Sequence, residues 1–206
     1  MTTEELYKKL EDPYFQDNSD SIFTNVYIYP YDIKQENKIL SEIKDFKKRL
    51  IRPSNNLDLL YVNIFELMTE YLKSKNFGKR GPWLKYFQNK EQEGLNMTDT
   101  ITQKIYNDND AFLKTLYNKI TVFLEKNKSK DDKLKRSIVI LYGFSQIHPY
   151  VRVNQLLSSF EKYNSGEHFK IILCYPGEAT ETSFSLFGIL KDNHAYRAQI
   201  LSEKYI

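Results

Sequence analysis

Two short apolar runs constrain the fold of this chain more than any other feature. Residues 137–143 read SIVILYG and residues 169–175 read FKIILCY. A nearly continuous apolar run of this length indicates a strand that is buried on both faces, as in parallel sheets whose two faces are covered by helices. The sequence therefore predicts an α/β fold built around these two strands.

The first third of the chain alternates strand and helix patterns. Residues 25–31 (NVYIYPY) and 57–65 (LDLLYVNIF) predict strands, and ELMTEYLKSK predicts a helix directly after the second one. A helix is also predicted between the strands, because apolar residues recur there at helical spacing: Ile33, Ile39, Leu40, Ile43, Phe46 and Leu50. Pro53 and Asn55-Asn56 end that helix. This alternation is typical of βαβ units and a parallel sheet.

The middle of the chain predicts a different organisation. Residues 76–90, which carry the only Trp, are predicted as a loop, and Thr98 as the start of a long helix with Asp99 in its first turn. The apolar stripe of that helix consists of Ile101, Ile105, Phe112, Leu116, Ile120 and Phe123. The charge run over residues 126–136 predicts a solvated loop.

The last third returns to the α/β pattern. Pro149 is predicted to begin a helix that ends at about Tyr163. The Pro176-Gly177 pair is predicted to end the second apolar strand, because Pro has no N–H group and Gly adopts positive φ. Leu186-Phe187-Gly188 is expected to pack the returning loop onto the body, and Ala195 to Leu201 to form a short final edge strand.

These elements predict a single α/β domain over residues 1–206, with a helical insertion at about 66–130. The expected architecture is a three-layer sandwich around a mostly parallel sheet of about four or five strands. It would be similar to a P-loop NTPase or a Rossmann fold that lacks the phosphate loop.

The composition of the chain limits the kinds of function that it can have. The chain has 30 Lys and Arg against 27 Asp and Glu, a net charge of +3 that is too mild to indicate nucleic-acid binding by itself. The single cysteine, Cys174, lies in an apolar run and predicts a buried, unreactive thiol in a reducing compartment. The N-terminus lacks the apolar core of a signal peptide, and no window reaches the roughly 18 apolar residues of a membrane span. We expect a soluble, cytoplasmic protein.

A nucleotide site is not indicated. A phosphate cradle needs glycines whose N–H groups approach the phosphates and a lysine at a fixed spacing, yet the turn after residues 25–31 contains no Gly. The segment Gly78-Lys79-Arg80-Gly81 has neither that spacing nor a preceding strand. Asp32 is expected to cap a helix rather than to bind magnesium.

A nucleophile elbow is the closest approach to a catalytic motif. Gly143-Phe144-Ser145-Gln146-Ile147 follows a buried strand and precedes a helix, but Ile147 stands where the elbow needs its second Gly. His148 and His194 are the available bases. The alternative interpretation is that Ser145 is a turn residue and that His148 caps the helix whose first turn holds Pro149.

The sequence gives little indication of a metal site or of a loop that binds nucleic acid. His148, His168 and His194 lack the spacing of metal ligands, so no metal or cofactor is expected. The basic, aromatic segment from Lys75 to Trp83 has two interpretations. It could stack on a nucleic-acid base, or Phe77 and Trp83 could anchor it to the body of the protein, and we favour the second.

The last seventy or so residues carry a specific resemblance. Pro149-Tyr150-Val151-Arg152 with Leu156-Leu157 is followed by Tyr175-Pro176-Gly177, Leu186-Phe187-Gly188 and Asn193-His194-Ala195-Tyr196-Arg197-Ala198. This series resembles the BrxB family of bacteriophage exclusion (BREX) systems. The earlier Tyr29-Pro30-Tyr31-Asp32 resembles a strand end of the family that reads FDYDP. Two departures stand out: Ala179 to Ser183 reads ATETS where the family has YDGQS, and His194 replaces an aromatic residue.

The resemblance implies a non-enzymatic scaffold or adaptor of a phage-defence complex. It implies as partners the alkaline-phosphatase-like PglZ protein and, directly or through it, the PglX DNA methyltransferase. Aromatic and Arg side chains on shaped loops are typical anchors of protein interfaces. The residues that we expect to bind a partner are His148, Tyr150, Arg152, Pro176, Gly177, Glu178, Asp192, Tyr196 and Arg197.

Two alternatives stay open. A degenerate serine hydrolase requires Ser145 and a histidine within hydrogen-bonding distance. A DNA-binding accessory subunit would use Lys79, Arg80 and the charge run over residues 126–136, and its DNA binding would depend on salt. If neither alternative holds, we expect the protein to contact nucleic acid only weakly or through its partners.

Overall fold

The computed structural model describes residues 1–16, 25–50, 57–127, 136–164, 169–180, 183–192 and 198–201. Five strands in this part of the chain form a parallel sheet in the order β2-β3-β4-β1-β7. Two short strands, β5 and β6, extend the sheet from β4 as an antiparallel hairpin. The strands are β1 (Val26–Tyr31), β2 (Leu57–Asn63), β3 (Arg136–Tyr142), β4 (Phe169–Ala179), β5 (Phe184–Leu186), β6 (Leu190–Asp192) and β7 (Gln199–Ile200).

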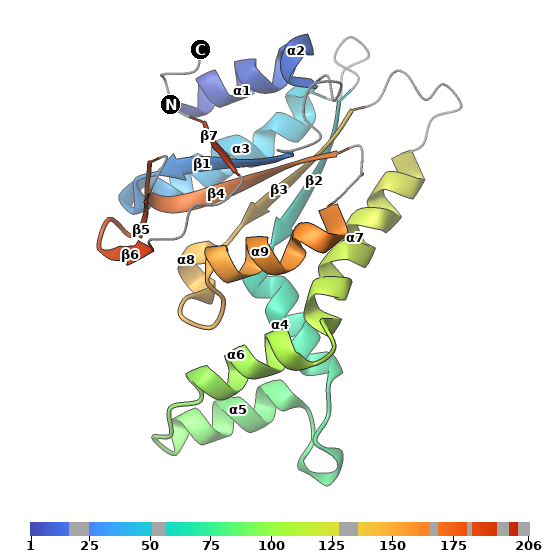
Figure 1. Ribbon diagram of the computed structural model, residues 1–206, viewed down its shortest axis with the longest axis vertical. Helices are drawn as coiled ribbons and strands as arrows, with labels where there is room; N and C mark the ends of the chain where they lie inside the picture. Colours follow the sequence, from blue (N-terminus) through green and yellow to red (C-terminus); the bar gives the residue numbers. More distant parts are fainter. Residues whose placement is uncertain are drawn as a thin grey trace.

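Helices cover both faces of the sheet and confirm the predicted three-layer α/β sandwich (Figure 1). One face carries α1 (Thr3–Glu11), α2 (Pro13–Gln16) and α3 (Glu36–Leu50), which follows the 3-10 turn η1 (Ile33–Gln35). The opposite face carries α4 (Ile64–Ser74), α7 (Ala111–Asn127), α8 (Phe144–Ile147) and α9 (Val153–Asn164). The turn η2 (Gly78–Arg80) leads to α5 (Trp83–Gln92) and α6 (Thr98–Asn107), and these two helices lie farthest from the sheet.

The two apolar runs form the middle of the sheet, as predicted. Ile138, Val139, Ile140 and Leu141 of β3, and residues 169–175 of β4, are all buried. Alternate residues along each strand enter different hydrophobic clusters, Val139 on the α4–α9 side and Ile140 on the α1–α3 side. Burial on both faces therefore accounts for the absence of polar alternation.

The helix predicted between the first two strands is also confirmed. Ile39, Ile43, Phe46 and Leu50 of α3 are buried against the sheet. The predicted strand 57–65 is shorter, because β2 ends at Asn63 and α4 begins at Ile64. The Asn63 side chain accepts hydrogen bonds from the N–H groups of Phe65 (3.0 Å) and Glu66 (3.3 Å), a helix cap that starts α4 two residues early.

The middle of the chain differs from the prediction in two places. The loop predicted over residues 76–90 is wrong in its second half, because α5 begins at Trp83 and places Trp83 and Phe87 on its buried face. The single long helix predicted from Thr98 is two helices. Asn109 and Asp110 have positive φ values of 48° and 57° between α6 and α7, a conformation that Asn and Asp adopt more readily than most residues.

Several remaining predictions fall partly outside the described residues. The final edge strand is confirmed as β7, which pairs in parallel with β1 at the end of the sheet, whereas residues 193–197 are not described. Pro53 and Asn55-Asn56, and most of the charge run 126–136, also lie outside. The single domain with a helical insertion stays a prediction. No helix in the described ranges is both long and apolar enough to cross a bilayer.

Candidate functional site

The carboxyl ends of β1 and β3 come together at one edge of the sheet, where ligands usually bind in open α/β sheets. The chain leaves β1 through Asp32, which caps η1 by accepting a hydrogen bond from the N–H of Lys34 (2.9 Å), as predicted. It leaves β3 through Gly143, whose φ of 87° turns the chain at once into α8. Asn63 Oδ1 lies 2.3 Å from where a Cβ at Gly143 would stand, so only Gly fits there.

The carboxylate of Glu36 links the ends of β1 and β3 through hydrogen bonds. Glu36, the first residue of α3, accepts a hydrogen bond from the Tyr31 hydroxyl (2.7 Å). The Ser145 hydroxyl of α8 lies 2.8 Å and 2.9 Å from the two Glu36 oxygens. We call Tyr31, Glu36 and Ser145 the Glu36 cluster. Burial, and then the hydrogen bond to Glu36, raise the pKa of Tyr31, so its hydroxyl remains a donor.

The Glu36 cluster has consequences for two of the sequence hypotheses. A carboxylate stands at the amino end of α3, where a nucleotide-binding protein of this architecture would receive a phosphate. Ser145 donates to Glu36 and, among the described residues, forms no hydrogen bond with His148. His168 and His194 lie outside the described residues. Cys174 is fully buried, as predicted, and burial raises the pKa of its thiol to about 12.

The segment after α8 differs from the prediction. Pro149 does not begin a helix: α8 ends at Ile147, a turn follows, and α9 begins at Val153. The Ile147 carbonyl accepts hydrogen bonds from the N–H groups of Tyr150 (2.9 Å) and Val151 (3.3 Å), which closes the turn. His148 is therefore the C-terminal cap residue of α8 and not the cap of a following helix, so the alternative interpretation of His148 is wrong.

Arg152 and Tyr150 take different places in this segment. Arg152 precedes α9, and its carbonyl accepts from the Leu156 N–H (2.9 Å), while its side chain is exposed. The Tyr150 hydroxyl donates to Glu91 of α5 (3.0 Å), and the Tyr150 carbonyl accepts from the hydroxyl of Thr102 in α6 (2.9 Å). Tyr150 thus connects helices α5 and α6 to the loop before α9.

The predicted end of β4 at Pro176-Gly177 is wrong, because the strand continues to Ala179 and changes partners on the way. Pro176 still pairs with Tyr31 of β1, whereas Gly177, Glu178 and Ala179 pair with β5 in antiparallel register. The Pro176 carbonyl accepts from the Phe187 N–H (2.9 Å), which holds the turn of the β5–β6 hairpin. Gly177 has a φ of 154°, and a Cβ there would lie 2.2 Å from the Ser185 carbonyl oxygen.

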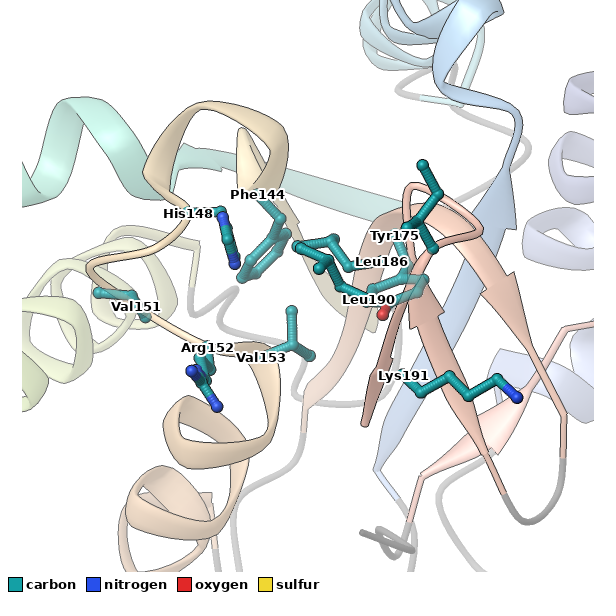
Figure 2. Close-up of a pocket in the computed structure, with 10 residues that line it drawn as sticks. Phe144, His148, Val151, Arg152, Val153, Tyr175, Leu186, Leu190 and Lys191 are labelled. Atoms are coloured by element: carbon teal, nitrogen blue, oxygen red, sulfur yellow. The ribbon is translucent and has the colours of Figure 1, made fainter. Parts of the chain in front are cut away.

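A cavity of about 270 Å³ lies between the α8–α9 segment and the β5–β6 hairpin (Figure 2). We call it the hairpin pocket. Its lining residues are Phe144, His148, Val151, Arg152, Val153, Tyr175, Leu186, Ile189, Leu190 and Lys191. Figure 2 shows Arg152 and Lys191 on opposite sides of the apolar residues.

The pocket is basic at its rim and apolar at its base. Of the described residues, those that line it include no Asp or Glu. Within the described ranges, neither Arg152 nor Lys191 forms an ion pair. Burial, and then the charge of Arg152, lower the pKa of His148, whose ring packs edge-on against Phe187 with 6.0 Å between centroids. Both effects favour the neutral form of His148.

The hairpin exposes apolar side chains beside this pocket. Ile189 is 79% exposed and Leu190 is 42% exposed, both in or next to the turn between β5 and β6. These two side chains add exposed apolar area at the edge of the cavity.

The structure brings some of the predicted site residues together. His148 and Arg152 line the hairpin pocket, and Pro176, Gly177 and Glu178 form the strand end that carries its hairpin. The side chain of Asp192 and the whole of Tyr196 and Arg197 lie outside the described residues. The other lining residues were not among the predicted site residues: Phe144, Val151, Val153, Tyr175, Leu186, Ile189, Leu190 and Lys191. The apolar pair Ile189-Leu190 directly after Gly188 is the signal that could have identified the hairpin.

The basic aromatic segment is anchored to the body, the interpretation that the sequence favoured. Trp83 is buried, Phe77 stacks on it with 5.3 Å between ring centroids, and the Lys104 ammonium lies 4.8 Å from the Trp83 ring. Lys79 and Arg80 are exposed. Among the described residues, no three His, Cys, Asp or Glu side chains are grouped as metal ligands would be.

Fold and pocket together define a three-layer α/β protein with an open, cation-rimmed apolar pocket at one edge of its sheet. A family model described as BREX protein BrxB matches residues 60–201. The chain is also 22% identical over 205 residues to the BREX protein BrxB of Bacillus cereus (strain H3081.97), an alignment that covers 98% of this chain and 96% of that protein. The chain therefore belongs to the BrxB family of BREX phage-defence systems, which confirms the resemblance. No solved structure matches it.

Proposed function

We propose that this chain is a non-catalytic adaptor of a BREX complex, and that it binds the alkaline-phosphatase-like PglZ protein and helps to assemble it with the PglX methyltransferase. The hairpin pocket carries this proposal. It combines exposed cations at its rim with exposed aliphatic side chains at its edge, the two features that a partner would cover.

The polar groups nearby favour a binding role over a catalytic one. The Ser145 hydroxyl, the nucleophile of the hydrolase alternative, is hydrogen-bonded to the Glu36 carboxylate. His148 lies on the pocket wall, where its ring packs against Phe187. The hydrolase alternative needs a histidine in contact with Ser145, whereas an adaptor needs only a shaped surface.

Co-purification with the PglZ-like protein of the same host tests the proposal. The tagged wild-type chain is expected to retain it stoichiometrically. Arg152→Glu is expected to weaken the complex, because it reverses the charge at the pocket rim without removing a buried group. Lys47→Glu is the matched control, since Lys47 is an exposed cation of α3 on the opposite face of the sheet.

The outcomes separate clearly. A complex that Arg152→Glu weakens and Lys47→Glu leaves intact supports an adaptor that docks through the hairpin pocket. Absence of a complex with the wild-type chain contradicts the proposal. The DNA-binding alternative would then be tested by the salt dependence of DNA retention in Lys79→Glu and Arg80→Glu.

A further inference from the structure

We infer that the hairpin pocket binds a short acidic segment of a partner protein, in which one large apolar side chain enters the pocket and flanking carboxylates meet Arg152 and Lys191. This inference rests on the proposed function and specifies the chemistry of the docked segment. It is carried by the size, the charge and the exposed edge of the pocket.

Size favours a side chain over a cofactor. Pockets for drug-sized ligands and cofactors usually span roughly 300–1,000 Å³. The hairpin pocket holds about 270 Å³ and is open to solvent on its hairpin side, where Ile189 is 79% exposed. A pocket of that size accommodates one large aliphatic or aromatic side chain. Phe144, Val153 and Leu186 supply the apolar contacts for it.

Charge favours an acidic segment. Arg152 and Lys191 lie on opposite sides of the apolar base, and in the described part of the chain no carboxylate neutralises either of them. Arg152 also stands directly before α9, so a carboxylate that meets its guanidinium lies near the positive end of a 12-residue helix. A segment with acids on both sides of an apolar residue therefore matches the arrangement of the pocket.

A nucleic-acid strand fits this arrangement less well. A phosphate backbone needs a continuous track of cations. Here the two cations are separated by apolar residues, and Ile189 and Leu190 project at the edge. An apolar side chain on a peptide would cover those two residues, whereas phosphates would leave them in water.

Selection from a random peptide display library on the immobilised full-length chain tests the inference. Enriched peptides are expected to share a large apolar residue with Asp or Glu on both sides. Synthetic copies should bind the Arg152→Glu/Lys191→Glu double variant at least about tenfold more weakly than the wild type, as expected for the loss of a charge-assisted contact. Both side chains are exposed, so the double variant should remain folded, which its urea unfolding curve checks.

Two further measurements make the test specific. Exchanging the acidic residues of an enriched peptide for Lys should restore binding to the double variant. Ile189→Ser should weaken the original peptide about tenfold, because it removes apolar contact area at the pocket edge. Tyr14→Ser is the control, since Tyr14 is 91% exposed on α2, which covers the other face of the sheet.

Peptides without acidic residues, no enrichment, or equal binding to wild type and double variant would overturn the inference. DNA binding that the double variant abolishes, without peptide enrichment, would also overturn it. Co-purification distinguishes this failure from failure of the proposed function. A partner that both chains retain equally overturns the inference and leaves the adaptor role intact, whereas a partner that the wild type does not retain refutes the adaptor role.

Discussion

The Glu36 cluster and the hairpin pocket lie at the carboxyl edge of the same sheet. The polar groups of the Glu36 cluster are hydrogen-bonded to one another, whereas the cations of the hairpin pocket are exposed. In the Glu36 cluster, two hydroxyls donate to one carboxylate within 2.9 Å, and the groups come from β1, α3 and α8. In the hairpin pocket, Arg152 and Lys191 face solvent, and the adjoining hairpin turn exposes Ile189.

The difference separates structural from functional polar groups at the edge of a sheet. A group whose hydrogen bonds are satisfied inside the chain stabilises the fold and gains little from a ligand. Covering exposed cations and adjacent apolar area with a complementary surface contributes favourably to the free energy of binding. The Glu36 cluster is thus expected to matter for stability and the hairpin pocket for binding.

The largest effect is expected from Gly177→Ala, which displaces the hairpin that forms one side of the hairpin pocket. A Cβ at Gly177 would lie 2.2 Å from the Ser185 carbonyl oxygen, so the β5–β6 hairpin must move. We expect a loss of about 3 kcal/mol in the free energy of unfolding, measured by urea denaturation, together with loss of the partner complex.

Gly94→Ala is the control for this substitution. Gly94 has a positive φ of 83°, but a Cβ added there would have no atom within 4 Å, so only the backbone penalty of about 1 kcal/mol applies. Equal losses for the two variants would show that close approach at Gly177 does not hold the hairpin.

Glu36→Ala is expected to have the next largest effect, and it acts on the Glu36 cluster instead of the hairpin pocket. It leaves the Tyr31 and Ser145 hydroxyls without their acceptor, which should lower the free energy of unfolding by about 2 kcal/mol. The folded variant should still retain the partner. Glu36→Gln keeps an acceptor oxygen and should lose less, and Asn37→Ala, at an exposed neighbouring position, should change little.

A Glu36→Ala variant that folds normally but loses the partner would contradict this assignment. The Glu36 cluster would then belong to the binding site, and the distinction between the two regions would not hold.

The smallest effect concerns pH and His148. Burial and the charge of Arg152 lower the pKa of His148 in the folded state. His148 therefore binds a proton at higher pH in the unfolded chain than in the folded chain. The stability that neutral His148 contributes is complete above the unfolded-state pKa of about 6.5 and is lost as the pH falls through the lower folded-state value. Between pH 7 and pH 5, His148→Gln should therefore lose less stability than the wild type in urea unfolding.

Titration of His148 by NMR gives the direct check. Its pKa should rise in Arg152→Gln, because a repelling cation has been removed. An unchanged pKa in that variant would show that Arg152 does not act on the pocket wall.

The elements that were predicted correctly are those whose sequence pattern is set by burial. The runs in β3 and β4 are buried on both faces and read as unbroken apolar segments, and the buried face of α3 gives a helical period. The elements that were missed differ from the prediction at a few local positions. Asn63 starts α4 early, Asn109 and Asp110 separate α6 from α7, and Trp83 begins a helix within a polar, glycine-containing segment.

The candidate site shows the same division. Its α8–α9 side was partly anticipated through His148 and Arg152, because that segment follows a recognisable strand. Its hairpin side was not, since β4 was expected to end at Pro176 and instead continues as the first strand of an antiparallel extension. A strand that changes partners keeps the same local sequence pattern, so its second pairing cannot be inferred from that pattern.

Apolar patterning and motif order are local properties of the chain, so the sequence alone was enough to predict the parallel part of the sheet and the family. Tertiary structure decided which polar groups are satisfied. Glu36 and Ser145 lie 109 positions apart, and Arg152 and Lys191 line the same pocket only because of the order of the strands in the sheet. Whether a charge is paired depends on distances between segments that are remote in the sequence, and only packing sets those distances.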